Sequence, residues 1–211
     1  MPDLRPVVFV VDDDPDVRAA LRRLIHSVGF DVETFTSASE FLNAKRARAP
    51  ACMILDVRLP DLSGLNLQGK LTEAGIDLPI IFITGHGDIP MSVRAMKAGA
   101  LDFLTKPFRD QELLEAIQSG IEKHREQLAK RAELSVLQMR FQALTPRERQ
   151  VFPLVAGGWL NKQIAAELGT SEKTIKIHRG QVMSKMKALS VADLVRMAEK
   201  LGLATTDNTA A

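Results

Sequence analysis

The chain has 211 residues, of which 45% are hydrophobic, 26% are charged and 5% are aromatic, and its single cysteine is Cys52. That length predicts one or two domains, each large enough to bury a core. No apolar run approaches the ~18 residues of a membrane span, residues 1–6 do not resemble a signal peptide, and one cysteine cannot form an internal disulfide, so we expect a cytoplasmic protein with no membrane-embedded part.

The net charge of +2 conceals an asymmetry between the two halves. Residues 1–120 contain 13 Lys or Arg against 17 Asp or Glu, whereas residues 121–211 contain 15 against 9. An acidic half followed by a basic half predicts a module that handles a metal or a phosphate, joined to one that binds a polyanion.

Four short apolar runs in the acidic half each end at polar residues. The runs and their ends are Val7–Val11 with Asp12, Asp13 and Asp14, Cys52–Leu55 with Asp56, Ile80–Ile83 with Thr84, and Leu101–Thr105 with Lys106 and Pro107. Short runs that are almost continuously apolar predict strands buried on both faces, as in a parallel sheet covered by helices. A fifth strand is expected at Val32–Phe35.

Helical patterns lie between these strands. They are expected at 17–25, 39–44, 65–74 and 90–98, and a fifth helix should begin near Asp110. The alternation of five strands with five helices predicts a doubly wound α/β fold with right-handed crossovers. Asp14, which precedes Pro15, is expected to cap the first helix.

The four polar strand ends should meet in one site, because ligands of such sheets bind beyond the carboxyl ends of the strands. The site would hold three carboxylates, a hydroxyl and an ammonium: Asp12, Asp13, Asp56, Thr84 and Lys106. Clustered carboxylates repel one another unless a cation joins them, and oxygen ligands suit Mg2+, which also accepts phosphate oxygens. Each acid alone is equally well explained as a helix cap, but the four ends together predict a site for Mg2+ and a phosphoryl group.

Residues 5–120 resemble the receiver domain of bacterial two-component response regulators. The residues that carry the resemblance are Asp12-Asp13, Asp56 with Leu59-Pro60-Asp61-Leu62-Ser63-Gly64, Thr84-Gly85, Ala98-Gly99-Ala100, Asp102-Phe103-Leu104 and Lys106-Pro107. The segments Ile83–Asp88 and Val93–Ala100 are similar to the FixJ-like subgroup in particular. The resemblance implies a flavodoxin-like sheet of five parallel strands in the order 2-1-3-4-5.

The resemblance also implies a role for each residue at the strand ends. Asp56 would be the phosphoacceptor, whose carboxylate attacks the phosphohistidine of a partner sensor histidine kinase. Mg2+ would be held by Asp12, Asp13, Asp56 and the main-chain carbonyl of Arg58. Lys106 would offset charge on the phosphoryl oxygens.

Two further residues would act as a switch. After phosphorylation, Thr84 would move inward and donate a hydrogen bond to a phosphoryl oxygen. Phe103 would then rotate into the space that Thr84 leaves. The altered surface of the fourth helix and fifth strand is expected to promote a homodimer around Val93, Lys97 and Phe103. The Lys106-Pro107 peptide is expected to be cis, which aims the ammonium into the site.

The main alternative for the acidic half is an enzyme. Phosphatases of the haloacid dehalogenase class also use an Asp nucleophile at a strand end together with Mg2+. They need a second Asp two residues later as a general acid, and this chain has Arg58 at that position. We therefore expect a phosphoacceptor that is not an enzyme and loses its phosphoryl group by slow self-catalysis at most.

Residues 121–144 contain neither glycine nor proline, which predicts one long helix that continues the fifth receiver helix. Leu134, Leu137, Phe141 and Leu144 follow the spacing of a coiled-coil seam over about two turns. The repeat is not sustained over three heptads, so a semi-rigid helical linker is favoured over a dimerising helix.

Four capped helices are expected after the linker. Thr145 and Glu148 form a capping box at the start of the first, and the others should lie at 161–168, 171–187 and 190–201. Two short helices, a glycine-containing turn and a longer basic helix predict a helix-turn-helix, whose last helix enters the major groove of DNA. In that basic helix the inward stripe would be Ile175, Val182 and Met186, and the basic residues that should face outward are Lys173, Lys176, Arg179, Lys185 and Lys187.

Residues 143–202 resemble the LuxR-type DNA-binding domain through Leu144–Arg149, Asn161–Ala165 and Lys173–Arg179. Position by position, the resemblance implies that Lys176 and Ile177 reach base edges. It implies contacts along the phosphate backbone for Thr174, His178, Arg179, Asn161 and Lys162. Two departures from the family pattern are Gly180, where relatives often place a base-reading side chain, and Pro153 inside the first helix.

These inferences divide the chain into a receiver domain at 1–120, a helical linker at 121–142, an all-α DNA-binding domain of four helices at 143–202 and a flexible tail at 203–211. They predict a phosphorylation-dependent transcriptional regulator. Its partners would be a sensor histidine kinase, double-stranded promoter DNA and RNA polymerase. An output half that binds RNA or protein is a second alternative, and the pair Lys176-Ile177 on a basic helix disfavours it.

Overall fold

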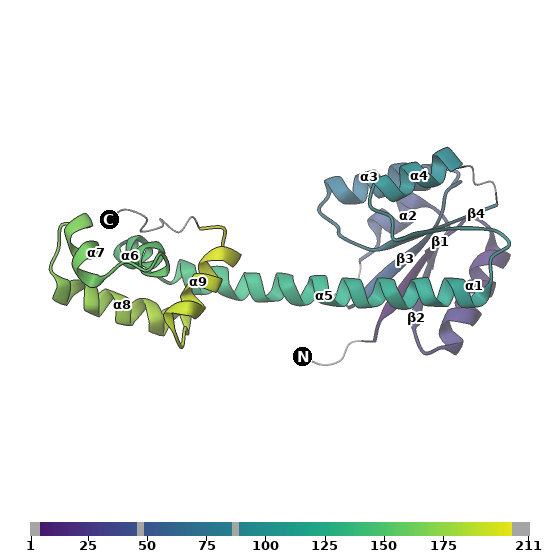
Figure 1. The fold of residues 1–211 in the computed structure, drawn as a ribbon. Coiled ribbons are helices and arrows are strands. Elements are labelled where there is room, and N and C mark those ends of the chain that lie inside the picture. The colour runs from purple at the N-terminus through teal and green to yellow at the C-terminus, as the bar shows by residue number, and fades with distance from the viewer. Residues whose placement is uncertain (1–4, 46–48, 86–88, 204–211) are drawn as a thin grey trace. The chain divides into compact units, whose positions relative to one another are not determined.

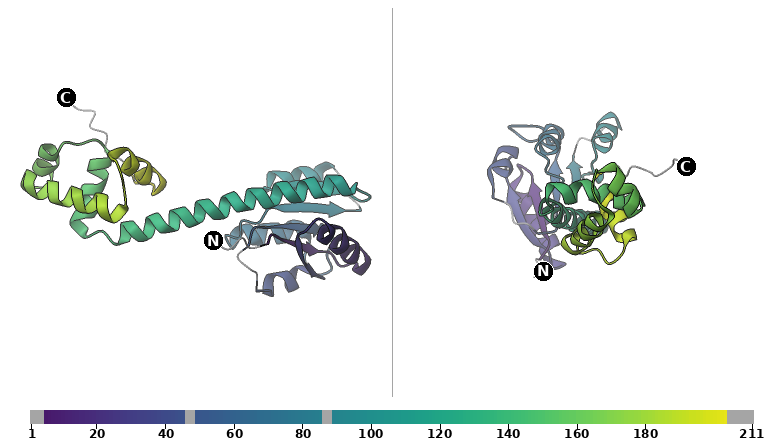
Figure 2. Two further views of the ribbon diagram at one scale, coloured as in Figure 1. Left: turned by 90° about the horizontal axis from the view of Figure 1, so that it is seen from below. Right: turned by 90° about the vertical axis from the view of Figure 1, so that its left-hand side faces the viewer.

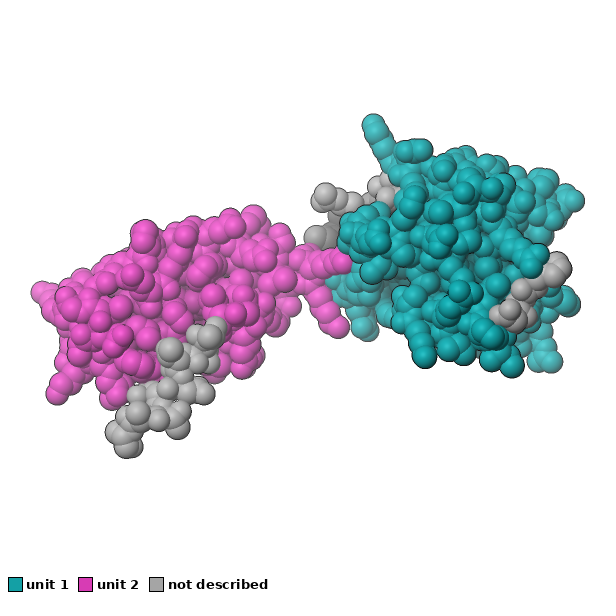
Figure 3. Space-filling model, turned by 90° about the horizontal axis from the view of Figure 1, so that it is seen from above, with its two compact units in different colours: residues 1–128 teal, residues 129–211 magenta. Residues whose placement is uncertain are grey.

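The computed structural model describes residues 5–45, 49–85 and 89–203. The chain forms two compact units, Met1–Leu128 and Ala129–Ala211 (Figure 3). The segment His86–Asp88 of the FixJ-like motif and residues 204–211 of the predicted tail lie outside the described residues.

The first unit is built on a parallel sheet with the strand order β2-β1-β3-β4-β5. Its strands are β1 (Val7–Val11), β2 (Asp31–Phe35), β3 (Ala51–Asp56), β4 (Ile80–Thr84) and β5 (Asp102–Thr105). Every residue of β1, β3 and β4 is buried, because helices cover both faces of the sheet. The predicted five-stranded order is confirmed.

Alternate residues of each strand point to opposite faces, and each face has its own core. On one face, Phe9 and Leu55 pack in a cluster with residues of α2 (Ala38–Asn43), α3 (Gly64–Glu73) and α4 (Ile89–Lys97). On the other, Val10 packs with residues of α1 (Pro15–Ser27) and of α5 (Asp110–Gln142). Figure 1 shows these two helical layers. The helices α2, α3 and α4 each lie one residue from the predicted ranges.

The strand register brings the polar ends to one edge of the sheet. Val11 pairs with Leu55, so Asp12 and Asp56 each come next in their strands. Asp56 itself pairs with Ile83, which places Thr84 one residue further along. Thr84 pairs with Thr105, and Lys106 follows. The four strand ends predicted to converge therefore do so because the strands between them are parallel and in register.

Helix α5 is continuous over its 33 residues, as predicted (Figure 2). Its first half packs closely on the sheet at Gly120, where an added Cβ would lie 3.0 Å from Cys52 Cβ and 3.0 Å from Leu101 Cδ2. The division between the two compact units falls inside this helix, after Leu128. The boundaries of a separate linker at 121–142 stay a prediction.

The second unit has the predicted four helices after α5: α6 (Pro146–Ala156), α7 (Asn161–Glu167), α8 (Glu172–Met186) and α9 (Val191–Lys200). The capping box of Thr145 and Glu148 is present, and α6 continues through Pro153. The buried residues of α8 are Ile175, Val182 and Met186, which are the predicted inward stripe.

Two residues of the suspected coiled-coil seam belong to the core of this unit. Leu144 is buried there, and Phe141 packs against the same core with its ring centroid 5.8 Å from that of Phe152. Leu137 is also buried. The apolar spacing of Phe141 and Leu144 at the end of α5 is thus explained by packing within the core of the second unit.

Candidate functional site

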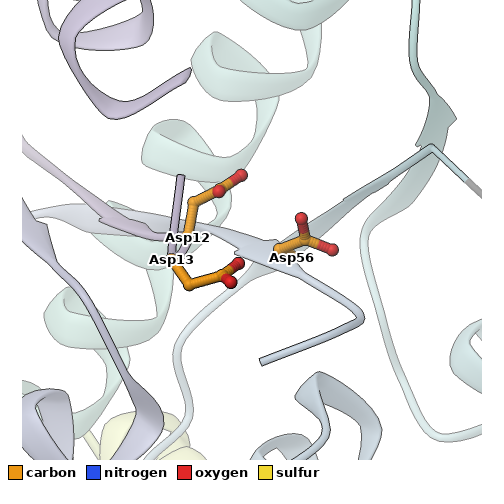
Figure 4. A group of neighbouring side chains, drawn as sticks. All are labelled: Asp12, Asp13 and Asp56. Carbon is orange, nitrogen blue, oxygen red and sulfur yellow. The ribbon is translucent and has the colours of Figure 1, made fainter. Parts of the chain in front are cut away.

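Three carboxylates gather where β1 and β3 end. Each of Asp12, Asp13 and Asp56 offers an oxygen, and these oxygens all lie within 4.8 Å of one another (Figure 4). Asp12 is fully buried, Asp56 is 9% exposed and Asp13 is exposed. A cluster with one open side can receive a ligand from solvent while the remaining side chains are held in place.

The ammonium of Lys106 bridges two of these acids. Its Nζ lies 2.8 Å from Asp12 Oδ2 and 3.0 Å from Asp56 Oδ2. Burial acts to lower the pKa of Lys106, but the hydrogen bonds to Asp12 and Asp56 outweigh it, and the pKa lies above its ordinary value. The Lys106-Pro107 peptide is cis, as predicted.

Burial dominates the electrostatics of Asp12. It raises the pKa of that carboxyl above its ordinary value, against hydrogen bonds from Lys106 and from the backbone N–H of Asp14, which act to lower it. Arg18 adds a further positive group, because its Nη1 donates to the carbonyl oxygen of Asp12 over 2.6 Å. The separate capping role falls to Asp14, whose Oδ1 accepts from Asp16 N at 2.8 Å and Val17 N at 3.3 Å.

The two candidate switch residues lie on neighbouring strands. Thr84 is buried at the end of β4, and its carbonyl oxygen accepts from Lys106 N at 2.8 Å. Phe103, on β5, is half-buried, with its ring centroid 6.2 Å from that of Phe82. Phe103 therefore packs at the border between the apolar core and the surface of α4 and β5.

The loop between β3 and α3 begins at the acidic cluster. The N–H of Arg58 donates to Asp56 Oδ1 over 3.0 Å, which brings residue 58 beside the carboxylates. Gly64 returns to the same place: a Cβ there would lie 2.4 Å from the carbonyl oxygen of Asp56. In the sequence, Gly64 belonged to the motif that resembles receiver domains, but no structural role was predicted for it.

In the second unit, the candidate DNA contacts lie on α7 and α8. Lys176 and Lys162 are exposed, and Ile177 is 59% exposed although it is apolar. Arg179 and Asn161 are joined by a hydrogen bond of 3.3 Å from Arg179 Nη1 to Asn161 Oδ1. Thr174 and His178 are half-buried on the same helix. Gly180 is exposed, with open space at its Cβ position.

The expectation that all basic residues of α8 face outward is wrong for Lys185. Its Nζ lies 2.7 Å and 3.0 Å from the two carboxylate oxygens of Glu148, which is only 4% exposed. Burial acts to raise the pKa of Glu148, but Lys185 and the N–H of Thr145 bring it below its ordinary value. This ion pair joins α6 to α8 and stabilises the fold.

Comparison with known proteins agrees with this geometry. Residues 8–118 match the response regulator receiver domain, and residues 142–198 match the luxR family of bacterial regulatory proteins. The chain belongs to the response-regulator family. It combines a receiver domain with a LuxR-type DNA-binding domain.

Similar proteins match over nearly the whole length of this response regulator. Nodulation protein W of Bradyrhizobium diazoefficiens is 53% identical over 94% of this chain and 88% of its own. FixJ of Azorhizobium caulinodans, a transcriptional regulatory protein, is 42% identical over 99% of this chain and 98% of its own. Among solved structures, response regulator StyR has a TM-score of 0.83 at 50% identity and covers 93% of this chain and 99% of its own.

Within the part of the chain that the structure describes, no helix combines the length and the apolar character needed to cross a membrane.

Proposed function

We propose that Asp56 accepts a phosphoryl group from the phosphohistidine of a partner sensor histidine kinase. The observation that carries the proposal is the ammonium of Lys106, which lies within 3.0 Å of both Asp56 and the buried Asp12. In the transfer, a carboxylate oxygen of Asp56 bonds to phosphorus, the P–N bond breaks, and the imidazole leaves with the electron pair. Lys106 would offset charge on the phosphoryl oxygens.

Mg2+ fits the acidic cluster, because three carboxylates lie together and oxygen donors suit this ion. The residues that would hold it are Asp12, Asp13, Asp56 and the main-chain carbonyl of Arg58. When bound, Mg2+ would neutralise negative charge on the phosphoryl group. Asp13, the exposed member, is the carboxylate that an incoming ion would meet from solvent.

We further propose that the acyl phosphate decays slowly. A phosphatase would need a general acid near the Asp56 nucleophile, and Arg58 occupies the position two residues later. A half-life of minutes or longer is expected. Multiple rapid turnovers of a phosphate ester would contradict this proposal.

A labelling experiment tests the phosphoacceptor. Incubation of the full chain with acetyl phosphate and Mg2+ should add one phosphate that hydroxylamine removes, as expected for an acyl phosphate, and Asp56→Ala should abolish it. Asp16→Ala is the matched control, because it removes an exposed carboxylate of α1 and should leave labelling unchanged. A label that persists in Asp56→Ala would show that Asp56 is not the phosphoacceptor.

We propose that phosphorylation promotes a homodimer through α4 and β5, around Val93, Lys97 and Phe103. Exposed apolar side chains on α4 support this, since Val93 is 43% and Met96 is 45% exposed. Thr84 and Phe103 would transmit the signal from Asp56 to that surface. Light scattering should show a doubled mass after phosphorylation, and Thr84→Ala should stay monomeric although labelled; an unchanged mass in the fully labelled wild type contradicts the proposal.

We propose that α8 reads promoter DNA in the major groove, with Lys176 and Ile177 at base edges. The phosphate contacts would come from Lys162, Thr174, His178 and Arg179. The exposure of Lys176 and Ile177 on a helix whose opposite stripe is buried supports this. A regulator of this kind would act in the cytoplasm, where DNA and RNA polymerase are available. Footprinting on random genomic fragments that finds no protected site would contradict the proposal.

A further inference from the structure

The loop between β3 and α3 makes a contact outside the acidic cluster. Asp61, near its middle, accepts from two backbone amides at the start of α2: Ala38 N at 3.3 Å and Ser39 N at 2.8 Å. These partners are 23 and 22 residues away in the sequence. The carboxylate also accepts from its neighbour Leu62 N at 2.9 Å, which fixes it within its own loop.

The start of α2 depends on this carboxylate. The first four N–H groups of a helix have no partner within the helix. In α2, the hydroxyl of Ser37 satisfies one of them, because it accepts from Glu40 N at 3.1 Å. Asp61 satisfies two more, those of Ala38 and Ser39. The cap of α2 is therefore shared between the adjacent residue and a distant loop.

The charge state of Asp61 agrees with this role. The hydroxyl and the backbone N–H of Ser39, together with the N–H of Ala38, hold the pKa of the Asp61 carboxyl at about 2. Asp61 is exposed to solvent, so the low pKa comes from donors directed at it. The carboxylate is ionised throughout the neutral range and lies at the positive end of α2.

The two ends of the same loop are fixed beside the phosphoacceptor. At its start, Arg58 N donates to Asp56 Oδ1, and at its end Gly64 N donates to Val57 O over 2.9 Å. Between these points the loop turns away to α2 and returns. The bonds of Asp61 therefore fix the middle of a loop whose first residues form one wall of the acidic cluster.

We propose that Asp61 is a positioning residue for the acidic cluster: by anchoring the β3–α3 loop to the start of α2, it holds the main chain of Arg58 in place to complete the Mg2+ site. The inference rests on the proposed function of that cluster. Asp61 touches neither the cluster nor the phosphoryl group, so its effect reaches Asp56 through the loop. Loss of the anchor should weaken Mg2+ binding, while Asp56 remains able to react and Lys106 remains beside it.

The test measures the Mg2+ dependence of acetyl phosphate labelling in the full chain. Asp61→Ala should raise the Mg2+ concentration for half-maximal rate about 10-fold, the lower end of what loss of an outer-shell partner causes. The rate at saturating Mg2+ should return to within about twofold of wild type. A merely destabilised protein would instead lose rate equally at every Mg2+ concentration. Glu73→Ala, which removes an exposed acid from α3, is the charge control and should not shift the curve.

A second variant keeps the test decisive if Asp61→Ala does not fold. Asp61→Asn retains one acceptor oxygen and should shift the Mg2+ curve by a smaller factor. Hydrogen exchange at Ala38 and Ser39 should accelerate in both variants. A Mg2+ curve that matches wild type in a folded variant would overturn the positioning role.

Failure of the proposed function looks different. If wild type shows no Mg2+-dependent label on Asp56, or if Asp13→Ala leaves its Mg2+ curve unchanged, the assignment of the cluster is wrong. If wild type and Asp13→Ala behave as expected but the Mg2+ curve of Asp61→Ala matches wild type, the assignment of the acidic cluster as a Mg2+ site is supported. Only the positioning role of Asp61 is then wrong.

Discussion

The candidate functional side chains of the receiver unit and of the DNA-binding unit differ in their exposure to solvent. In the receiver, Asp12 is fully buried and Asp56 is nearly so, and Lys106 donates a hydrogen bond to each of them. In the DNA-binding unit, the candidate contacts Lys176 and Lys162 are exposed.

The difference follows from the ligand that each unit handles. The phosphoryl group proposed for the receiver is small and would meet Asp56 at a largely buried place, where low dielectric strengthens its interaction with the ammonium of Lys106. DNA is a large polyanion that an exposed basic surface must reach. In the second unit, the buried charge of Glu148 is instead paired with Lys185 and holds two helices together. Buried charge therefore belongs to the proposed reaction site in the receiver, and to an ion pair between two helices in the DNA-binding unit.

The largest expected effect tests the ammonium of Lys106, which bridges Asp12 and Asp56. Lys106→Ala should lower the rate of acetyl phosphate labelling about 100-fold, because removal of a preorganised positive donor weakens stabilisation of the transferring group. Quantitative mass spectrometry of the labelled chain measures the rate. Lys70→Ala is the control, since it removes an exposed lysine from α3. A decrease in the labelling rate of less than about threefold would show that Lys106 has no role in phosphoryl transfer.

The next effect separates two lysines of α8. Lys185→Ala should destabilise the DNA-binding unit by about 2 kcal/mol, because Glu148 stays buried without its charged partner. Lys176→Ala should change stability by less than about 0.5 kcal/mol, as usual for an exposed side chain. Urea unfolding followed by the fluorescence of Trp159, the single tryptophan of the chain and a member of this unit, measures both.

The pH dependence sharpens the same comparison. The pKa of Glu148 in the fold lies below its ordinary value of 4.5, so its contribution to stability is present above that value and is lost as the pH falls through the lowered pKa. The stability gap between wild type and Lys185→Ala should therefore shrink below about pH 4. A gap of constant size down to the acid transition would show that Lys185 acts through packing.

Sequence patterns could predict the receiver site because parallel strands place their ends at one edge. Asp56 and Thr84 could be predicted from the apolar runs before them, and the register of β3 with β4 pairs Asp56 with Ile83, so that Thr84 follows one residue further along. The inward stripe of α8 was predictable for the same kind of reason, since helical periodicity alone selects Ile175 and Val182.

Contacts between distant segments could not be predicted in this way. Lys185 and Glu148 are 37 residues apart in the sequence, and their pairing depends on how α6 packs against α8. The local sequence pattern predicted only a capping role for Glu148. Asp61 lay inside a recognised motif, but the path of its loop to α2 is not encoded in neighbouring residues. The spacing of Phe141 and Leu144 favoured a helical linker over a dimerising helix, and the same spacing also suits a domain core, so their packing in the second unit was not predicted.

The smallest expected effect concerns how exposed lysines divide the work on DNA. Lys176→Ala should weaken operator binding by about 1 kcal/mol, or about fivefold, and random DNA much less, because a lysine can donate to guanine O6 and N7. Lys162→Ala should weaken both DNAs alike and flatten the dependence of affinity on salt, since one fewer counterion is released. Titrations of both DNAs at two salt concentrations separate the two roles. If Lys176→Ala lowered the affinity for operator and random DNA equally, Lys176 would be a phosphate contact. Recognition of the base sequence would then depend on Ile177, whose exposed side chain can pack against a thymine methyl.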